Sequence, residues 1–316
     1  MSDLPYIDGD TLRRLVPVED AVRALAGALR GGLDPEGGTP RQVAGVPAGQ
    51  LLLMPAAHGR YAGVKVVSVA PGNPARGLPR IQGTYLLFDG GTLTPVAAMD
   101  GVALTALRTP AVSALAAAHL AGPDARSLAV FGTGPQAWGH VEALRAVRPV
   151  ERVTVVGRDL GRARGLAARS AGLGLTAEAV SMGDGRAVAR AVASADLIAC
   201  CTSAREPLFP GDLVADGATV VVVGSHEPDA REIDGDLVTR ATVVVESRAA
   251  ALAEAGDVIM PVRAGLIGPE HLAGDLADLV NGEVKPGPAP RVFKSVGMAW
   301  EDLIVAAAVH EAWAGR

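Results

Sequence analysis

The stretch SLAVFGTGPQAWGH, residues 127–140, joins an apolar run to a glycine-rich turn and to the start of a second apolar pattern. The run SLAVF is short, apolar and ends at glycine, which predicts a buried strand. The residues PQAWGHVEALRAV (135–147) carry apolar side chains at helical spacing and predict a helix. This strand–turn–helix unit decides the fold, because related units follow it along the chain.

Apolar strands and helices alternate downstream of this unit. Further strands are predicted at 152–157, 177–180, 196–202, 218–225 and 242–247, and helices at 160–172 and 184–195. Strands that are apolar throughout and alternate with helices pair in parallel and are covered on both faces. The sequence therefore predicts an α/β fold with a Rossmann-type doubly wound parallel sheet.

The first third of the chain has a different rhythm. A helix is predicted at 18–32, and short β-rich runs follow at 51–57, 61–70, 81–89 and 94–101, separated by turn residues. A long Ala-rich helix at 104–122 comes next, and the last segment, 292–315, begins as a strand and continues as a helix. We expect a smaller α+β domain from 1–118 and 292–316, and a nucleotide-binding domain at 119–291.

Composition excludes several classes of protein. The 316 residues are 49% hydrophobic with a net charge of −5, and no long basic run suggests a nucleic-acid partner. The two cysteines, Cys200 and Cys201, are adjacent and cannot easily form a disulfide, which fits a reducing compartment. Residues 1–10 lack a signal-peptide pattern, and no uninterrupted apolar run has membrane-spanning length. The six histidines show no metal-ligand spacing. We expect a cytoplasmic protein without a membrane partner or a metal.

The glycine turn has the form G-x-G-x-x-A, with Gly132, Gly134 and Ala137. The first glycine permits the tight turn, the second lets the backbone approach a pyrophosphate, and the alanine lets the helix pack closely on the strand. The alternative is an ordinary turn in a glycine-rich chain. The position between a strand and a helix favours dinucleotide binding.

The end of the second strand bears on the choice of cofactor. A site for NAD usually carries an acid there that binds the ribose hydroxyls. Here Gly157 is followed first by Arg158 and then by Asp159. Because an arginine at this point suits a 2′-phosphate, the sequence favours NADP(H), and NAD(H) remains possible if Asp159 binds the ribose.

Several stretches together resemble one known family. They include GVK at 63–65, GTY at 83–85, LTALRTPA at 104–111, GTGPQA at 132–137, GSHEPDARE at 224–232 and VFKSVGMAWEDL at 292–303. In this order they resemble the ornithine cyclodeaminase/μ-crystallin family over nearly the whole chain. The resemblance implies a substrate-binding and dimerisation domain beside the nucleotide domain, and a homodimer formed through the sheet of the first domain. It also implies hydride transfer between nicotinamide and the Cα–N bond of a small amino or imino acid.

The resemblance implies that Arg41, Lys65 and Arg108 bind the substrate carboxylate, with Thr84 near the substrate. Arginine suits this role because it can bind a carboxylate with two parallel hydrogen bonds. Each cation alone could instead be a surface charge. Lys65 lies in an apolar strand, where an unpaired charge is costly, and it could protonate an imine if burial and neighbouring arginines lower its pKa.

Cofactor contacts are expected at the turn and at several strand ends. Thr202 and Ser203 follow the fourth strand of the α/β region, at the edge where such sheets bind ligands. Lys294 is expected to be a solvated charge at a strand edge, or to lie with Ser295 near the nicotinamide. The full expected set is Thr109, Gly132, Gly134, Gln136, Ala137, Arg158, Thr202, Ser203, Gly224 and Ser295.

His226 is the residue at which the chain departs from part of the family. Deaminating members carry an aspartate two residues after the strand-end glycine, and here that position, counted from Gly224, is His226. The histidine could relay a proton near neutral pH or could only cap the loop, and both interpretations stay open. Pro228, Asp229, Arg231 and Glu232 are predicted to lie at the start of a helix after this loop.

The leading hypothesis is therefore an NAD(P)H-dependent imino-acid reductase of the ketimine or Δ1-pyrroline-2-carboxylate type. One alternative is a cyclodeaminase that converts ornithine or lysine to a cyclic imino acid and releases ammonia. A second is a non-catalytic, NADP-dependent small-molecule binding protein of the crystallin type. The retained Arg41, Lys65 and Arg108 argue against the second alternative.

Overall fold

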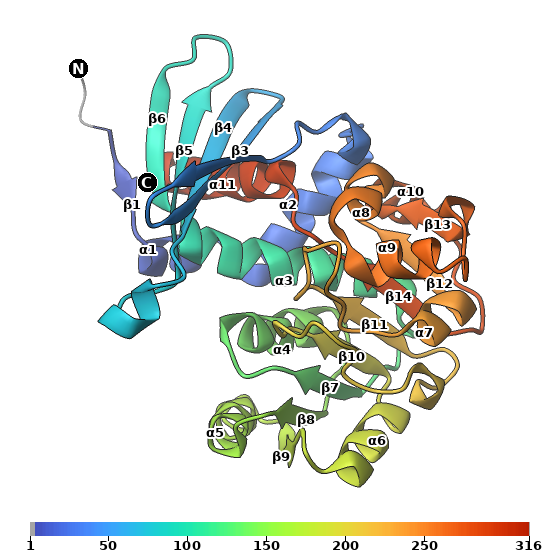
Figure 1. Cartoon of the computed structure of the whole chain (residues 1–316). Coiled ribbons are helices and arrows are strands. Elements are labelled where there is room, and N and C mark those ends of the chain that lie inside the picture. Colours follow the sequence, from blue (N-terminus) through green and yellow to red (C-terminus); the bar gives the residue numbers. More distant parts are fainter. Residues whose placement is uncertain (1–3, 316) are drawn as a thin grey trace. The chain divides into compact units, whose positions relative to one another are not determined.

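The computed structural model describes residues 4–315 and divides the chain into two compact units (Figure 1). The first unit comprises the residues up to Thr109 and those from Met298 onward, and the second unit is Pro110–Gly297. Residues 1–3 and 316 lie outside the described part. The first three residues of the stretch 1–10 and the last residue of the predicted segment 292–316 are therefore outside the described residues.

A six-stranded sheet with the order β1-β6-β5-β4-β3-β2 forms the first unit's framework. Strands β2 to β6 pair antiparallel with their neighbours, and β1 pairs parallel with β6. The predicted meander of consecutive strands is therefore present, with β2 as an additional, exposed edge strand. The bounds are β1 (Tyr6–Ile7), β2 (Gln42–Val46), β3 (Gly49–His58), β4 (Tyr61–Val69), β5 (Ile81–Asp89) and β6 (Pro95–Asp100).

One face of this sheet is covered by helices. The C-terminal helix α11 (Ala299–Ala314) packs on β3, β4 and β5, and also on α2 (Val18–Arg30) and α1 (Gly9–Leu15). Two short 3₁₀ turns, η1 (Pro35–Gly37) and η2 (Asn73–Arg76), lie in the connections. The covered face carries a row of side chains in register across four strands, and all four are buried: Met54, Lys65, Tyr85 and Met99. A lysine thus takes a core position between methionine and tyrosine.

Helix α3 (Gly101–Leu120) runs across the division between the two units, which falls at Thr109 and Pro110. Its length and apolar composition would allow it to span a membrane, but 72% of its apolar window is buried inside the protein. A helix that packs in the interior of a globular protein has the same composition.

The second unit contains an eight-stranded sheet with the order β13-β12-β14-β11-β10-β7-β8-β9. Every pairing in it is parallel. From β7 the chain adds β8 and β9 on one side and then β10 and β11 on the other, so the order reverses between β7 and β10. This topology confirms the Rossmann-type prediction. The bounds are β7 (Ser127–Phe131), β8 (Arg152–Gly157), β9 (Thr176–Ser181), β10 (Leu197–Cys200), β11 (Thr219–Val222), β12 (Thr242–Val245), β13 (Leu272–Asp275) and β14 (Arg291–Lys294).

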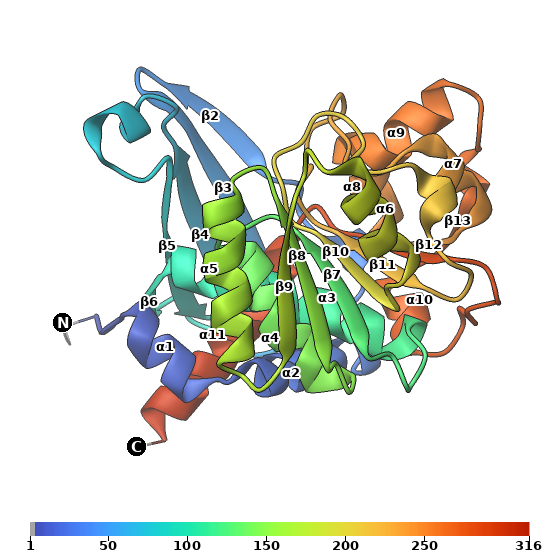
Figure 2. The same cartoon turned by 90° about the horizontal axis from the view of Figure 1, so that it is seen from below.

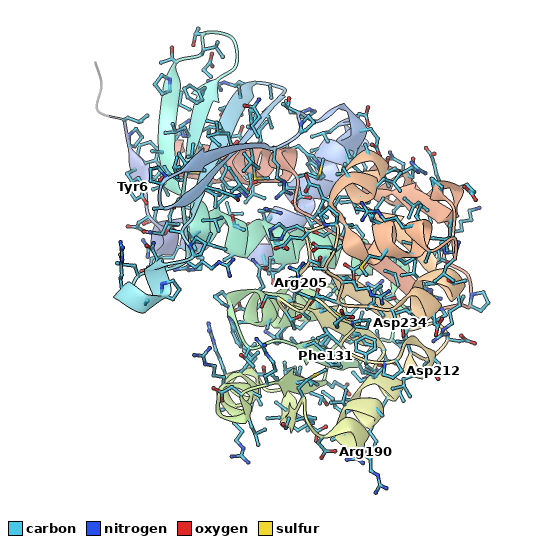
Figure 3. The ribbon with its side chains drawn as sticks, viewed as in Figure 1. Tyr6, Phe131, Arg190, Arg205, Asp212 and Asp234 are labelled. Carbon is cyan, nitrogen blue, oxygen red and sulfur yellow. The ribbon has the colours of Figure 1, made fainter. Side chains whose placement is uncertain are left out.

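Helices lie on both faces of the parallel sheet (Figure 2). Within the core, Phe131 packs on Phe209 with ring centroids 4.9 Å apart (Figure 3). The helices are α4 (Pro135–Val147), α5 (Leu160–Ala171), α6 (Gly185–Ala193), α7 (Gly235–Arg240), α8 (Arg248–Glu254), α9 (Gly256–Arg263) and α10 (Leu276–Val280), with 3₁₀ turns η3 (Gly211–Leu213) and η4 (Pro269–His271).

The unit boundaries differ from those expected from the sequence. The predicted boundary between 291 and 292 falls inside β14, which pairs with both β11 and β12 and therefore belongs to the second unit. The predicted boundary after 118 lies within α3, beyond the division at Thr109. The Pro- and Gly-rich stretch 286–291 favours a boundary there, but strand β14 begins at Arg291, and helix α3 continues past residue 118 to Leu120.

Candidate cofactor and substrate sites

The glycine turn after β7 lets a ligand approach the backbone closely. Gly132 has φ +118°, and a Cβ there would lie 2.5 Å from the carbonyl oxygen of Cys201, so only glycine fits. At Gly134, the N-cap of α4, a Cβ would meet nothing within 4 Å, so the backbone is open to a ligand. Ala137 is fully buried against the sheet. The turn and the start of α4 thus fit a dinucleotide phosphate.

The ribose end of such a cofactor would lie near the end of β8. Asp159 is the N-cap of α5, and its carboxylate accepts a hydrogen bond from the Arg162 backbone N–H at 3.1 Å. The preceding residue, Arg158, is exposed. Both side chains are exposed, and the aspartate also caps α5, so an accessible arginine stands at the position predicted for a 2′-phosphate contact.

A buried histidine that the sequence did not single out supports the first turn of α4. His140 is 0% exposed, and burial lowers its pKa to about 4, so the ring is neutral. Its Nδ1 lies 2.8 Å from the Gln136 carbonyl oxygen, which only accepts, so Nδ1 carries the proton. Its Nε2 therefore accepts from the Ser113 hydroxyl at 2.9 Å. The backbone carbonyl of Gln136, a predicted cofactor residue on a half-buried turn, is held by this ring.

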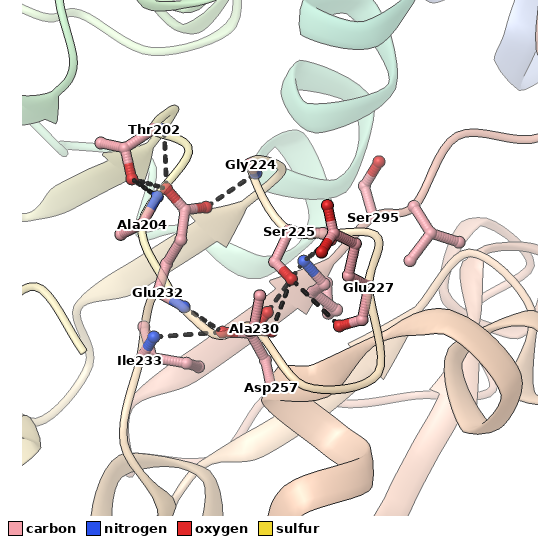
Figure 4. A network of polar contacts seen from close by, with 12 residues as sticks. Thr202, Ala204, Gly224, Ser225, Glu227, Ala230, Glu232, Ile233, Asp257 and Ser295 are labelled. Atoms are coloured by element: carbon pink, nitrogen blue, oxygen red, sulfur yellow. Dashed lines mark hydrogen bonds and ion pairs between the residues drawn. The ribbon is translucent and has the colours of Figure 1, made fainter. Parts of the chain in front are cut away.

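Glu232 joins the ends of β10 and β11 (Figure 4). Its carboxylate is 0% exposed and accepts from the backbone N–H and the hydroxyl of Thr202, both at 2.7 Å, and from the Gly224 N–H at 2.7 Å. Gly224 must be glycine, because a Cβ there would collide with the Thr202 carbonyl oxygen. The hydroxyl of Thr202 thus points to Glu232, while the neighbouring Ser203 is exposed.

The prediction of a helix beginning at Pro228 is wrong. Residues 223–234 form an irregular loop, and the next helix, α7, begins after its N-cap Asp234. Arg205 fixes the exposed part of this loop through ion pairs with Glu227 at 2.7 Å and Asp229 at 2.5 Å. These exposed ion pairs and the buried carboxylate of Glu232 hold the segment as a loop despite its helix-start pattern.

The expectation that Lys294 is a solvated charge is also wrong. Its side chain is 1% exposed, forms an ion pair with Asp257 Oδ2 at 2.9 Å, and donates to the Ser225 carbonyl oxygen at 2.6 Å. The other oxygen of Asp257 accepts from the Glu232 and Ile233 N–H groups at 2.7 and 3.1 Å. A charge at this depth is stable only with such partners.

The Ser295 hydroxyl donates a hydrogen bond to Glu246. The side chain is buried, and its hydroxyl donates to Glu246 Oε1 at 2.5 Å. The other oxygen of Glu246 accepts from the Val296 and Gly297 N–H groups at 2.8 and 2.7 Å. The Ser295 hydroxyl is therefore directed at Glu246, and a contact of this residue with the cofactor stays a prediction.

His226 lies on the exposed side of the loop after β11. The preceding residue, Ser225, is buried, and its hydroxyl donates to the Ala230 carbonyl oxygen at 2.5 Å. The loop is thus anchored directly beside the histidine, at the carboxyl edge of the parallel sheet. A proton-relay role for His226 stays a prediction.

In the first unit, four charged side chains form one buried cluster. Lys65 Nζ forms an ion pair with Asp302 Oδ2 at 2.7 Å and donates to Thr105 Oγ1 at 3.3 Å. Arg108 donates to Asp302 Oδ1 at 3.1 Å and to Glu301 Oε2 at 2.6 Å. The cluster thus holds two cations and two anions that are almost completely enclosed.

The two acids of this cluster were missed from the sequence, although a signal exists. Glu301 and Asp302 stand together in the first turn of α11, which is otherwise mostly apolar. Acids in the first turn of a helix are favoured by its dipole, which gives an ordinary explanation for them. Only the fold shows that these acids face Lys65 and Arg108 rather than solvent.

Burial changes the proton affinity of Lys65. Desolvation, assisted by the positive charge of Arg108, lowers its pKa to about 8, and the Asp302 carboxylate opposes this shift. Tyr85, its neighbour across β4 and β5, is fully buried, and desolvation together with Asp302 raises the phenol pKa well above 10. The Tyr85 hydroxyl lies so close to Gly63 that a Cβ at residue 63 would collide with it.

The structure does not bring every predicted substrate residue to this cluster. Thr84 is exposed and adjacent to Tyr85 in β5, so its side chain lies on the opposite face of the sheet from Lys65. Arg41 is half-buried just before β2, and Thr109 is buried in α3 directly after Arg108. Lys65 and Arg108 therefore lie together, whereas Thr84 lies apart from them, and its place near the substrate stays a prediction.

The cysteines and the potential metal ligands add no further site. Cys200 and Cys201 are free thiols, and burial raises the pKa of each. Within residues 4–315, no group of three or more His, Cys, Asp or Glu side chains is arranged to hold a metal ion.

Comparison with known proteins gives this arrangement a family. The model of the ornithine cyclodeaminase/mu-crystallin family matches residues 14–316. The chain belongs to this family. Among its relatives is the Δ1-pyrroline-2-carboxylate reductase of Paracoccus denitrificans, 36% identical over 317 residues, which cover 97% of this chain and 96% of the relative. The ketimine reductase mu-crystallin of Rattus norvegicus is 35% identical over 254 residues, 79% of this chain and 75% of the relative.

A solved structure shows the same likeness in three dimensions. The Δ1-pyrroline-2-carboxylate reductase of Thermococcus litoralis, in complex with NADH and L-proline, superposes with a TM-score of 0.91 at 30% identity. The superposition covers 99% of this chain and 98% of the other. The likeness of this family member therefore extends over both units.

Proposed function

We propose that this family member is an NAD(P)H-dependent reductase of small cyclic imino acids, of the ketimine or Δ1-pyrroline-2-carboxylate type. The observation that carries the proposal is the buried amine of Lys65, held beside Arg108 with a pKa lowered to about 8. The names of the Paracoccus and Thermococcus relatives support the same reaction class. A nicotinamide cofactor, when bound, supplies the hydride that adds to the imine carbon.

Lys65 acts as the general acid in this proposal. An imine accepts hydride well only when its nitrogen carries a proton, and an ammonium with a pKa near neutral gives up a proton readily. Below a pH of about 8 most Lys65 side chains are protonated and can donate. Arg108 and Arg41 are proposed to bind the substrate carboxylate, with Glu301 and Asp302 fixing Arg108 in place.

The second unit binds the cofactor in this proposal. The open backbone at Gly134 and the N-terminus of α4 bind the pyrophosphate, and the loops after Thr202 and Gly224 form the neighbouring wall. NADP(H) is the favoured form, because Arg158 is exposed while Asp159 caps α5. NAD(H) is the alternative, and the Thermococcus relative is in complex with NADH.

We also propose that the chain forms a homodimer through the outer face of the first unit's sheet. That face carries a row of half-buried apolar side chains in register on four strands, namely Pro55, Val64, Leu86 and Ala98. Apolar side chains that remain partly exposed in such a row are typical of an interface. Analytical ultracentrifugation should show a dimer that the Leu86→Arg variant dissociates, and a monomeric wild type would refute the proposal.

A substrate screen tests the enzymatic proposal directly. Oxidation of NADPH and NADH is followed with five- and six-membered cyclic imino acids, and ammonia release is followed with ornithine, lysine and alanine. We expect cofactor oxidation with a cyclic imine and no ammonia from ornithine. Ammonia release that disappears in His226→Ala would favour a cyclodeaminase instead. Cofactor binding without turnover of any substrate would favour a non-catalytic binding protein.

A further inference from the structure

Asp302 occupies the centre of the buried cluster in the first unit. One carboxylate oxygen lies 2.7 Å from Lys65 Nζ, and the other accepts from Arg108 Nε at 3.1 Å. The side chain itself is 0% exposed. Glu301, its neighbour in the chain, contacts Arg108 at 2.6 Å, and its influence on Lys65 is the weakest of the three charged neighbours. Of the two acids, Asp302 is therefore the direct partner of the lysine.

We infer that Asp302 is the positioning residue and fixed counter-ion for the proton that Lys65 donates, an inference that rests on the function proposed above. Together with the Thr105 hydroxyl, at 3.3 Å, it holds the amine in one place. It also supplies the negative charge that balances the positive charge before and after proton transfer.

The proton-transfer step balances without any further group. An N–H bond of the Lys65 ammonium breaks, and its electron pair stays on Nζ. The imine nitrogen of the substrate uses its lone pair to form the new N–H bond. The positive charge moves from Lys65 to the substrate nitrogen, while the carboxylate of Asp302 stays in place. Because a fixed carboxylate in a buried site needs no reorganisation, it stabilises the new cation as it forms.

Every charged group that faces Lys65 enters this balance. Asp302 and Glu301 approach from α11, Arg108 from α3, and the neutral phenol of Tyr85 lies beside it on β5. Arg108 and burial disfavour the ammonium, and the two acids favour it, with Asp302 exerting the larger effect. Without the charge of Asp302, burial and Arg108 should lower the pKa of Lys65 further.

The chain offers a direct measurement, because it contains only three lysines: Lys65, Lys285 and Lys294. Protein labelled with ¹³C at the lysine ε-carbon gives three side-chain signals, which Lys→Arg variants assign. Titration of these signals reports the pKa of Lys65 without any substrate, with the exposed Lys285 as an internal reference. In Asp302→Asn the pKa of Lys65 should fall from about 8 to about 7 or lower.

Two matched variants make the result specific. Glu301→Gln removes the neighbouring acid and should shift the pKa of Lys65 less than Asp302→Asn does. Asp302→Glu retains the charge and should keep the pKa near the wild-type value. An unchanged Lys65 pKa in Asp302→Asn would overturn the inference, and so would an equal shift in Glu301→Gln.

The pH dependence of imine reduction provides a second test of the pKa of Lys65. Imine reduction needs the protonated amine, so the wild-type rate should fall as the pH rises through about 8. In Asp302→Asn this alkaline limb should move to lower pH, and in Glu301→Gln it should move less. A wild type that reduces no imine would refute the proposed function, whereas the titration would still test the role of Asp302.

Asp302→Asn could fail to fold near neutral pH, because it leaves Lys65 with a buried, uncompensated charge. The folded pKa of Lys65 would then lie far below its unfolded value, so the unfolded state binds more protons and stability rises with pH. The variant should therefore regain its structure between about pH 8 and pH 10. An unfolded variant that gains no stability with rising pH would contradict the inference as well.

Discussion

Lys65 in the first unit and Lys294 in the second are held in nearly the same way by an aspartate. The ion pairs measure 2.7 and 2.9 Å, and both lysines are almost completely buried. Their other partners differ. Lys65 contacts side chains, the Thr105 hydroxyl and the acid that also binds Arg108, whereas Lys294 binds a backbone carbonyl and an acid that accepts backbone N–H groups.

The difference separates a chemical role from a structural one. A lysine whose partners are backbone groups fixes the path of the chain, here the loop between Ser225 and Ile233. A lysine whose partners are side chains from two helices has its amine fixed in one position. Its pKa is then set by burial and by the charges around it. Burial alone would assign both residues to the same class.

The largest expected effect is on catalysis by Lys65→Met. Loss of the general acid should lower kcat for imine reduction by about 10²–10⁴-fold. Steady-state rates across a range of imine concentrations measure this effect, and the cofactor affinity should stay unchanged as a control. Full turnover with a normal KM would remove Lys65 from the site and would break the comparison.

Lys294→Met should instead act on stability. The substitution leaves Asp257 buried without its cation and close to a second acid, Glu232, at a cost of about 3–5 kcal/mol. Urea unfolding measures the change, and Lys285→Met, at an exposed position, is the control. A loss below about 1 kcal/mol would mean that Lys294 does not serve as a structural ion-pair partner.

Glu232→Gln tests the carboxylate that joins the ends of β10 and β11. Its backbone N–H donates to Asp257, the ion-pair partner of Lys294. The amide of glutamine would place an NH₂ group against donors that now meet a carboxylate oxygen, which costs about 1–3 kcal/mol. Because the loops after β10 and β11 lose their common anchor, the affinity for NAD(P)H should fall as well. Fluorescence titration of the reduced cofactor measures that fall. An unchanged cofactor affinity would show that the hydrogen bonds of Glu232 serve only folding.

Arg158, which is exposed unlike Lys65 and Lys294, should give the smallest effect. Arg158→Ser is expected to raise the KM for NADPH by about tenfold, since a charge-assisted hydrogen bond is worth about 1.5–3 kcal/mol before solvent screening. The KM for NADH should change little. Equal effects on both cofactors, or none on either, would argue against recognition of a 2′-phosphate.

The sequence predicted what depends on neighbouring residues. The Gly132–Gly134 turn, the alternation of strands and helices, and the meander of the first unit all follow from local patterns. The loop after β11 did not, because Glu232 accepts hydrogen bonds from Thr202, 30 residues before it in the chain. The ion pairs of Lys65 and Lys294 likewise join segments that only the fold brings together.

The family motifs predicted only some of the residues of the buried cluster. They selected Lys65 and Arg108, which the structure brings together, but they also selected Thr84, which lies on the other face of the same sheet. The motif GTY contains both Thr84 and Tyr85, and the pleat decides which of them faces Lys65. In the folded strand Tyr85 and Leu87 are buried and Thr84 is exposed, a pattern that the run IQGTYLLFD does not show by itself.

Gly63 and Tyr85 are sterically coupled. Since the tyrosine hydroxyl occupies the space that a side chain at 63 would need, neither position can change freely while the other is retained. Among relatives we expect covariation, with alanine or serine at 63 only where residue 85 is shorter than tyrosine. Such paired changes would reshape the space next to the Lys65 amine, giving lineages a route to different substrates without altering the charged residues.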